Sequence, residues 1–293
     1  MEKKIVIAGG TGFIGSYLNE RFTELGFKVY IISRGSNHLN WKDDKSIVNA
    51  LENAEMLINL TGKSVDCRYT YKNKWNILTS RTESTLYLHR LIERCTNPPK
   101  IWINSSTATI YRHADDRPMT EDNGDIGSGF SVHVAQCWEN AFFSVLHKNT
   151  RQVALRIAIV LGDSGVLKPI KLLTKIGLGG KQGDGKQKFS WIHIEDLFRI
   201  IQFIHENPSQ TQIYNCAAPN PVTNAEFMCT MRNVHHQKIG IPLPKNILKI
   251  GAFIVRTEDE LILKSRWVLP EKLLHEGFEF KYANIRIALE EIG

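Results

Sequence analysis

The stretch Lys4-Ile5-Val6-Ile7-Ala8-Gly9-Gly10-Thr11-Gly12-Phe13-Ile14-Gly15 decides the fold of this 293-residue chain. An apolar strand runs directly into Gly-x-x-Gly-x-x-Gly, and the pattern of a helix follows. Such a turn points backbone N–H groups and the positive end of a helix dipole at one place, which suits a pyrophosphate. The glycines matter because a Cβ would hinder the approach of the ligand or the packing of helix on strand. The stretch predicts a dinucleotide-binding β-α-β unit.

The residues after the second predicted strand, 28–32, indicate which dinucleotide binds. An Asp or Glu there would accept hydrogen bonds from the ribose 2′-hydroxyl of NAD. Ser33 and Arg34 stand there instead. A guanidinium offers a planar fork of donors that matches a phosphate, so NADP(H) is favoured over NAD(H). A solvated loop arginine is the alternative interpretation.

The composition is typical of a soluble, enzyme-sized protein. At 42% hydrophobic residues, the chain can bury the core of one large α/β domain or of two unequal ones. No apolar run approaches the roughly 20 residues of a membrane helix, and we expect no signal peptide, because a strand is predicted at the N-terminus. Five scattered cysteines without C-x-x-C spacing favour a cytoplasmic location and argue against a metal site or disulfides. The net charge of +7 is dispersed, so we expect no nucleic-acid partner.

Strand and helix patterns alternate through the first half of the chain, which predicts a doubly wound parallel sheet of the Rossmann type. Helices are expected over 46–51, 75–94 and 132–146, and further strands over 56–60, 101–104 and 153–157. We predict an NADP-binding domain over 1–165, to which later segments return, and a mostly substrate-side lobe over 166–293. Ligands of such sheets bind at the carboxyl ends of the strands.

Three further motifs give the chain a resemblance to a known family. They are Asn-Ser-Ser-Thr-Ala-Thr-Ile-Tyr over 104–111, Trp-Ile-His-Ile-Glu-Asp-Leu over 191–197 and Gly-Leu-Gly-Gly over 177–180. Nearly end to end, the chain resembles the extended short-chain dehydrogenase/reductases. Within them it is similar to the atypical branch of epimerase family proteins, which are nucleoside-diphosphate-sugar epimerase-like. The resemblance implies a smaller C-terminal substrate lobe with a family-specific region over about 240–293.

The strand ends and this resemblance together predict where the cofactor lies. Leu60, Thr61 and Gly62 end the third strand and should contact the adenine–ribose half. Arg81, on the helix over 75–94, is expected to hold a phosphate, a ribose or a substrate anion, with an exposed helix arginine as the alternative. The predicted cofactor-binding residues are Gly9, Thr11, Gly12, Phe13, Ile14, Gly15, Ser33, Arg34, Leu60, Thr61, Gly62, Arg81, Ser105 and Ile159.

Active members of the family use a Ser or Thr, a Tyr and a Lys. The Tyr exchanges a proton with the substrate oxygen, the Lys lowers the pKa of the Tyr and holds the ribose, and the Ser/Thr orients the substrate. Thr107 falls at the Ser/Thr position. Aligning the chain on Glu139 puts Ser131 at the Tyr position and Ala135 at the Lys position. The resemblance therefore implies that the usual acid–base pair is absent.

Other titratable groups near these motifs are candidates for the missing acid. Tyr111, which closes its motif, is the first candidate, and a bound water is the alternative proton source. The competing interpretation of Tyr111 is a packed aromatic side chain with a satisfied hydroxyl. Glu121, His133 and His193 are further candidates. A solvated histidine is favoured at 133, and a structural one at 193.

Two functions remain open from the sequence. The first is an NADP-dependent oxidoreductase or epimerase that acts on a nucleotide-sugar-like or small carbonyl substrate, with Thr107 and Tyr111 as catalytic residues. The alternative is a non-catalytic NADP(H)-binding sensor or regulatory protein, which the loss of Tyr and Lys favours. We expect a small-molecule substrate as the partner, no membrane association, and a monomer or homodimer.

Overall fold

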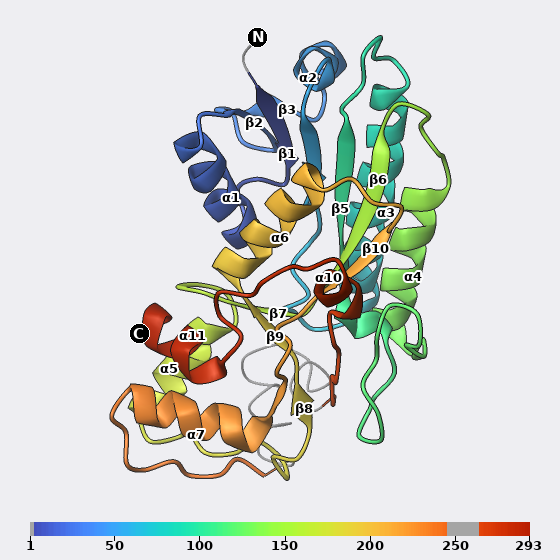
Figure 1. The fold of residues 1–293 in the computed structure, drawn as a ribbon. Coiled ribbons are helices and arrows are strands. Elements are labelled where there is room, and N and C mark those ends of the chain that lie inside the picture. Colours follow the sequence, from blue (N-terminus) through green and yellow to red (C-terminus); the bar gives the residue numbers. More distant parts are fainter. Residues whose placement is uncertain (1–2, 245–263) are drawn as a thin grey trace.

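A sheet of seven strands lies at the centre of the computed structural model, which describes residues 3–244 and 264–293 (Figure 1). All of its strand pairs are parallel. The spatial order is β10 (Ile213–Cys216), β6 (Arg151–Ile157), β5 (Ile101–Thr107), β4 (Met56–Asn59), β1 (Lys4–Ala8), β2 (Lys28–Ser33) and β3 (Leu39–Asn40). The chain starts in the middle and winds outward in both directions, which confirms the predicted doubly wound fold.

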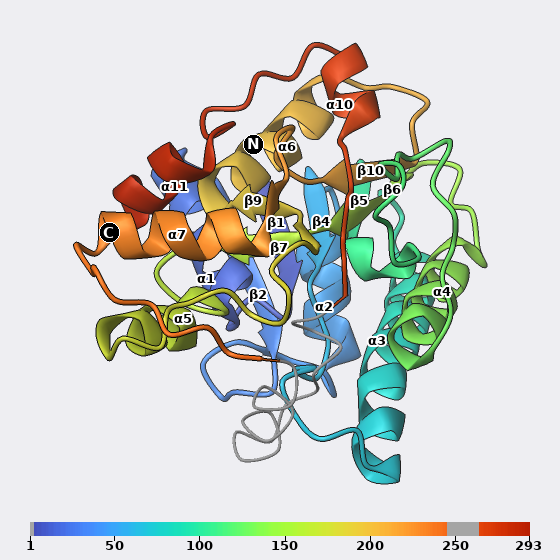
Figure 2. The same cartoon turned by 90° about the horizontal axis from the view of Figure 1, so that it is seen from below.

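Helices cover both faces of this sheet, and Figure 2 shows α6 and α2 on opposite sides of the strands. One face packs against α1 (Phe13–Glu24) and α6 (Ile194–Glu206). The other packs against α2 (Asp44–Leu51), α3 (Tyr71–Ile92) and α4 (Phe130–Phe143). Successive side chains of a strand point to opposite faces, so in β1 Ile5 and Ile7 are buried on one face and Val6 and Ala8 on the other.

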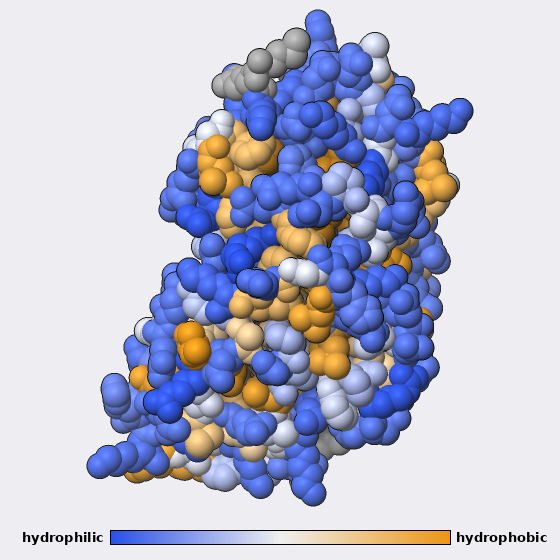
Figure 3. Space-filling view, viewed as in Figure 1, coloured by the Kyte–Doolittle hydropathy of each residue, from blue (hydrophilic) through white to orange (hydrophobic). Residues whose placement is uncertain are grey.

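A smaller lobe lies below the sheet in Figure 1. Its elements are α5 (Leu167–Lys175), α7 (Asn224–Val234), α11 (Ile285–Ile292) and the strand pairs β7 (Ile159–Leu161) with β9 (Trp191–His193) and β8 (Lys188–Phe189) with β11 (Val222–Thr223). Two short helices, η1 (Ala108–Ile110) and α10 (Glu271–His275), complete the described elements. Hydrophilic residues dominate the face in Figure 3, and the apolar ones there form separate patches. Within the described ranges, no helix is long and apolar enough to cross a lipid bilayer.

Segments that follow the first elements of the lobe in sequence return to the sheet. Both α6 and β10 follow residue 190, yet both pack into the sheet. The division at residue 165 stays a prediction. Of the region predicted over about 240–293, residues 245–263 lie outside the described part of the chain.

Two elements differ from their predicted bounds in ways that matter for the site. The helix predicted over 75–94 begins earlier because Thr70 caps it, with its side chain accepting a hydrogen bond from the backbone N–H of Asn73. The strand predicted over 101–104 continues to Thr107, whose hydroxyl caps η1 by accepting from the Thr109 N–H at 3.1 Å. Thr107 therefore lies at the carboxyl end of β5.

A pair of histidines, His89 in α3 and His147 after α4, makes stability depend on pH. Nε2 of His89 donates to two carbonyl oxygens, and Nδ1 lies 2.8 Å from Nε2 of His147. Burial lowers the pKa of both histidines, and for His89 the charge of His147 lowers it further. The unfolded chain therefore takes up protons first as the pH falls.

We expect the free energy of unfolding to decrease as the pH falls below about 6.5, the ordinary pKa of histidine. The decrease should end once the pH is below the lowered pKa values that His89 and His147 have in the folded protein. The slope should reach about 1.4 kcal/mol per pH unit for each proton taken up. Urea unfolding at pH 7.5 and 5.5 measures it. His147→Gln keeps an N–H donor but takes up no proton, so this variant should lose part of the slope. An unchanged slope in the variant contradicts the assignment.

Candidate functional site

The glycine turn after β1 has two kinds of glycine. Gly9 has φ +78, and a Cβ there would lie 2.9 Å from the carbonyl carbon of Leu60. At Gly15 a Cβ would lie 2.6 Å from the Cα of Gly10, so α1 packs closely on the turn. Gly12 differs, because a Cβ there would meet only the Gly9 oxygen, at 3.8 Å. It caps α1 without a capping side chain, which leaves the first turn of the helix open to a ligand.

A cavity of about 940 Å³ lies in front of this turn, between the carboxyl ends of β1, β2 and β4 and the side of α3. Trp41 and polar side chains of α3 form part of its wall. Six predicted residues, Phe13, Ile14, Gly15, Arg81, Ser105 and Ile159, are outside its lining. The predicted cofactor residues that line it are Gly9, Thr11, Gly12, Ser33, Arg34, Leu60, Thr61 and Gly62.

Ser33 and Arg34 form the end of the cavity beside β2. The Ser33 hydroxyl is buried and accepts a hydrogen bond from the Gly35 N–H at 3.1 Å. The Arg34 side chain is exposed, and within residues 3–244 and 264–293 it has no carboxylate partner. Its fork of donors is therefore available to an anion in the cavity.

A buried asparagine fixes the segment that follows β4. Nδ2 of Asn59 donates to Asn104 and to Thr85, at 2.7 and 3.1 Å. Oδ1 of Asn59 accepts from the N–H and the hydroxyl of Thr61, at 3.1 and 2.5 Å. These bonds hold the cavity wall at Thr61 in one conformation.

Arg81 lies directly behind that wall. A Cβ at Gly62 would be 2.8 Å from its guanidinium carbon, which also lies 5.1 Å from the ring centre of Trp138 on α4. Nη1 donates to the carbonyl oxygens of Lys63 and Ile77, at 3.0 and 2.9 Å. Burial lowers the pKa of Arg81 to about 10, so the group stays charged at neutral pH. The structure thus places a partly buried cation between the cavity wall and α4.

Tyr111 is only 2% exposed and belongs to a buried polar network. Its hydroxyl donates to Asn215 and accepts from Arg156, both at 2.9 Å. Arg156 binds both carboxylate oxygens of Glu139, at 2.9 and 2.8 Å, and the Ser106 hydroxyl donates to the same carboxylate. Burial raises the pKa of Tyr111. This geometry favours the interpretation of a packed aromatic with a satisfied hydroxyl.

The other titratable candidates have structural partners or lie on the surface. His193 accepts from the Glu195 N–H and pairs with Glu291 at 2.8 Å. Glu121 accepts from the backbone N–H of Asn215, and burial raises its pKa. His133 is exposed. In the described part of the chain, no group of His, Cys, Asp and Glu is arranged to hold a metal ion.

A side chain that the sequence did not suggest lies beside the start of α4. Ala135 is fully buried in an apolar cluster with Tyr111. The hydroxyl of Ser131, however, lies 3.5 Å from the hydroxyl of Tyr69. Tyr69 stands in the irregular segment between β4 and α3, where no periodic pattern signals a role.

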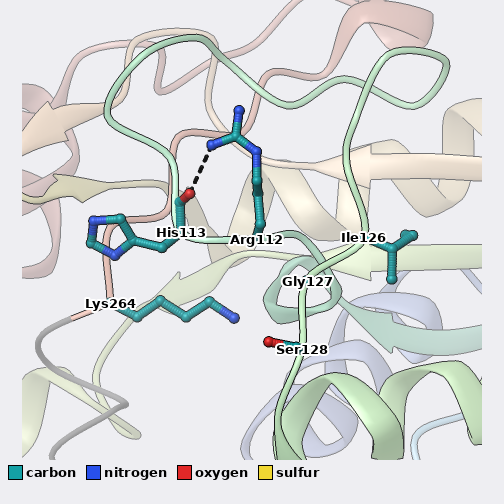
Figure 4. A pocket seen from close by; sticks show the side chains of 6 residues that line it. All are labelled: Arg112, His113, Ile126, Gly127, Ser128 and Lys264. Carbon is teal, nitrogen blue, oxygen red and sulfur yellow. Dashed lines mark hydrogen bonds between the residues drawn. The ribbon is translucent and has the colours of Figure 1, made fainter.

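A second cavity, of about 510 Å³, follows β5 (Figure 4). Arg112 is paired with Asp116, and it also donates to the carbonyl oxygen of His113. Lys264 extends beneath Arg112 toward Ser128, and its ammonium donates to the Thr109 carbonyl oxygen at 3.1 Å. The lining residues are Arg112, His113, Ile126, Gly127, Ser128 and Lys264. Arg112 also pairs with Asp125, and His113 pairs with Asp115, so these two basic side chains of the lining have carboxylate partners.

Comparison with known families gives two matches. The profile of the NAD dependent epimerase/dehydratase family matches residues 5–136. A domain of unknown function, DUF1731, matches residues 243–292. The first match covers β1 to the start of α4 and therefore the larger cavity.

Curated relatives match along nearly their whole length. Epimerase family protein YfhF of Bacillus subtilis is 33% identical over 98% of this chain and 97% of its own. Epimerase family protein SDR39U1 of Homo sapiens is 30% identical over 99% of both chains.

Among solved structures, human SDR39U1 (isoform 2) with NADPH superposes with a TM-score of 0.89 at 30% identity, covering 99% of this chain and 98% of that one. The nucleoside-diphosphate sugar epimerase of Corynebacterium glutamicum has a TM-score of 0.79 at 26% identity, covering 100% of this chain and 59% of that one. A UDP-N-acetylglucosamine 4-epimerase of Bacillus cereus, 16% identical over 99% of this chain and 95% of that one, shares the fold with a TM-score of 0.75.

Proposed function

The chain belongs to the epimerase family proteins, and on this premise we propose that it is an NADP(H)-dependent oxidoreductase or epimerase. The substrate we propose is a nucleotide sugar or another small carbonyl compound. The observation that carries the proposal is the 940 Å³ cavity formed by the glycine turn, Ser33-Arg34 and the end of β4. The human relative with a TM-score of 0.89 was crystallised with NADPH, which supports the same cofactor here.

The residues present fit this cofactor. Gly12 faces open space at the uncapped start of α1, where backbone N–H groups would hold a pyrophosphate. Arg34 is exposed in the cavity and has no carboxylate partner among the described residues, so it would hold the 2′-phosphate. The backbone of 60–62 would contact the adenosine half. When bound, the nicotinamide supplies or receives a hydride.

The chain's own residues would position the substrate. Thr107, at the carboxyl end of β5, is proposed to orient the substrate oxygen. Lys264 in the lining of the second cavity suits an anionic group such as the diphosphate of a nucleotide sugar. Tyr111 or a bound water stays the predicted proton source, and the two hydrogen bonds of the Tyr111 hydroxyl favour the water.

Replacing Arg34 by Asp tests the cofactor assignment. NADPH binding should weaken by at least about 2 kcal/mol, because a charge-assisted phosphate contact is lost and a repulsive charge is added. NADH binding should change much less, since NADH has no 2′-phosphate. Fluorescence titration with both nucleotides measures the two affinities.

Lys148→Asp is the matched control, because it makes the same charge change at an exposed residue outside the cavity lining. It should leave both affinities unchanged. Equal affinity of the unmodified protein for NADH and NADPH contradicts the assignment. NADPH binding without turnover of any nucleotide sugar or carbonyl compound would favour the sensor alternative. A cytoplasmic location and a monomeric or homodimeric state remain predictions.

A further inference from the structure

An aromatic side chain stands beside Arg34 in the wall of the larger cavity. Strands β2 and β3 run parallel, and Ser33 pairs with Asn40 at their last position. The next residues, Arg34 and Trp41, therefore leave the sheet at the same edge, and both line the cavity. Among the described residues of that lining, Trp41 is the one aromatic side chain. The cavity thus offers an aromatic surface next to the arginine that would hold the 2′-phosphate.

Trp41 is held in place by α3. The Tyr87 hydroxyl donates to the Trp41 carbonyl oxygen at 2.8 Å and also bonds to the carboxylate of Asp44. The centres of the Trp41 and Tyr87 rings lie 5.8 Å apart. Trp41 is partly buried and packs against the apolar core on this face of the sheet. One part of the indole is therefore fixed by the protein, while the part that lines the cavity is open to a flat ligand.

A carboxylate from α3 also lines the cavity. Glu83 precedes Tyr87 by four residues, so the two share a face of the helix, and Tyr87 in turn bonds to Trp41. The Glu83 carboxylate forms no hydrogen bond or ion pair with another described residue. The hydroxyl groups that α3 contributes to the lining differ, because they donate to carbonyl oxygens of the helix itself; they belong to Thr79, Ser80 and Ser84. Glu83 is thus available to a donor on the ligand.

The adenosine half of NADPH presents groups that match these side chains. Adenine has flat faces that stack on an aromatic ring, and its 6-amino group donates hydrogen bonds. A carboxylate accepts from such an amino group but is repelled by the 2′-phosphate. A guanidinium has the opposite preference. The charges therefore match the phosphate to Arg34 and the base to Glu83.

We propose that Trp41 and Glu83 form an adenine subsite in the cofactor cavity. The indole stacks on the base, and the Glu83 carboxylate accepts a hydrogen bond from the 6-amino group. This inference rests on the proposed NADPH-dependent function and adds to it the recognition of the base. Arg34 contacts the phosphate that distinguishes NADPH from NADH, whereas Trp41 and Glu83 contact a part that both nucleotides share. Loss of either side chain should therefore weaken the binding of both nucleotides.

The fragment 2′,5′-ADP tests the stacking without the nicotinamide. We expect it to quench the tryptophan fluorescence of the unmodified protein and not that of Trp41→Leu. In calorimetry, Trp41→Leu should bind NADPH about 10-fold more weakly, and Trp41→Phe, which retains an aromatic ring, should stay within about three-fold. Trp75→Leu is the matched control and should change neither result, because Trp75 is 56% exposed on α3 and outside the cavity lining. Quenching that persists in Trp41→Leu overturns the stacking.

Etheno-NADP⁺ tests the hydrogen bond, because its bridge between N1 and N6 of adenine removes the N–H donors and keeps a flat base. The unmodified protein should bind it at least about five-fold more weakly than NADP⁺. Glu83→Ala should reduce this ratio to less than about two-fold. Glu20→Ala, at an exposed residue outside the lining, is the control and should leave the ratio unchanged. A ratio that survives Glu83→Ala overturns the hydrogen bond to the amino group.

The two proposals fail in different ways. NADPH binding that Trp41→Leu and Glu83→Ala leave unchanged overturns the adenine subsite and leaves the proposed function standing. Weaker binding in Glu83→Ala by the same factor for NADP⁺ and etheno-NADP⁺ moves the carboxylate to the ribose 3′-hydroxyl, which also contradicts the subsite. Absence of NADPH and NADP⁺ binding in the unmodified protein overturns the proposed function, and the subsite with it.

Discussion

Replacement of Gly12 by valine is expected to weaken NADPH binding strongly while leaving the fold intact. Gly12 has φ −83, which any residue can adopt, and a Cβ there would have only the Gly9 oxygen within 4 Å, at 3.8 Å. The valine side chain would therefore project into the cavity, over the N–H groups at the start of α1. We expect the affinity to fall at least about 100-fold, which corresponds to about 2.7 kcal/mol.

Gly15→Ala provides the contrast, because its Cβ would lie 2.6 Å from the Cα of Gly10 and force the turn and the helix apart. That variant should lose stability as well as binding. Gly12→Val should lower the melting temperature by only a few degrees, since the N-terminal cap of a helix tolerates such changes at a cost of about 1 kcal/mol. NADPH titration and thermal unfolding separate the two effects. Normal NADPH binding by Gly12→Val would place the pyrophosphate elsewhere.

Replacement of Glu139 by leucine is expected to cost about 3–5 kcal/mol of unfolding free energy. The side chains of Arg156 and Glu139 are 9% and 10% exposed, and Arg156 binds both carboxylate oxygens. Removing the carboxylate leaves a buried guanidinium without its counter-ion. The Ser106 hydroxyl loses its acceptor as well.

The double variant Glu139→Leu, Arg156→Met separates the lost pair from the unpaired charge. It should regain part of the stability, because neither charge is then buried alone. Urea unfolding of the single and double variants gives the coupling energy. A loss of less than about 1 kcal/mol in Glu139→Leu shows that the pair is effectively solvated.

Local sequence patterns predicted most of the sheet. The glycine turn and the apolar runs at 4–8, 28–32 and 56–60 correspond to β1, β2 and β4. β1 and β4 are buried on both faces and form continuous apolar runs, and β2 is partly buried. β10 was not predicted, because its residues, Ile-Tyr-Asn-Cys, include a polar asparagine and form no continuous apolar run.

The candidate site was predictable where it depends on the backbone and not where it depends on distant side chains. The spacing of the glycines and the pair Ser33-Arg34 identify the cavity directly. The environment of Tyr111 depends on Asn215, from the strand that was not predicted. Tyr69 approaches Ser131 only through the irregular path between β4 and α3, which no local propensity describes.

The position of β10 has a consequence for how the protein is made. Until Cys216 has emerged from the ribosome, the nascent sheet has β6 as an open border, with unsatisfied backbone groups along one side. The apolar surface that α6 later shields is also bare until Glu206 has been synthesised. Such a nascent chain is prone to aggregate, and the vulnerable period lasts through most of translation. Early chain termination would therefore yield insoluble fragments rather than a working nucleotide-binding half.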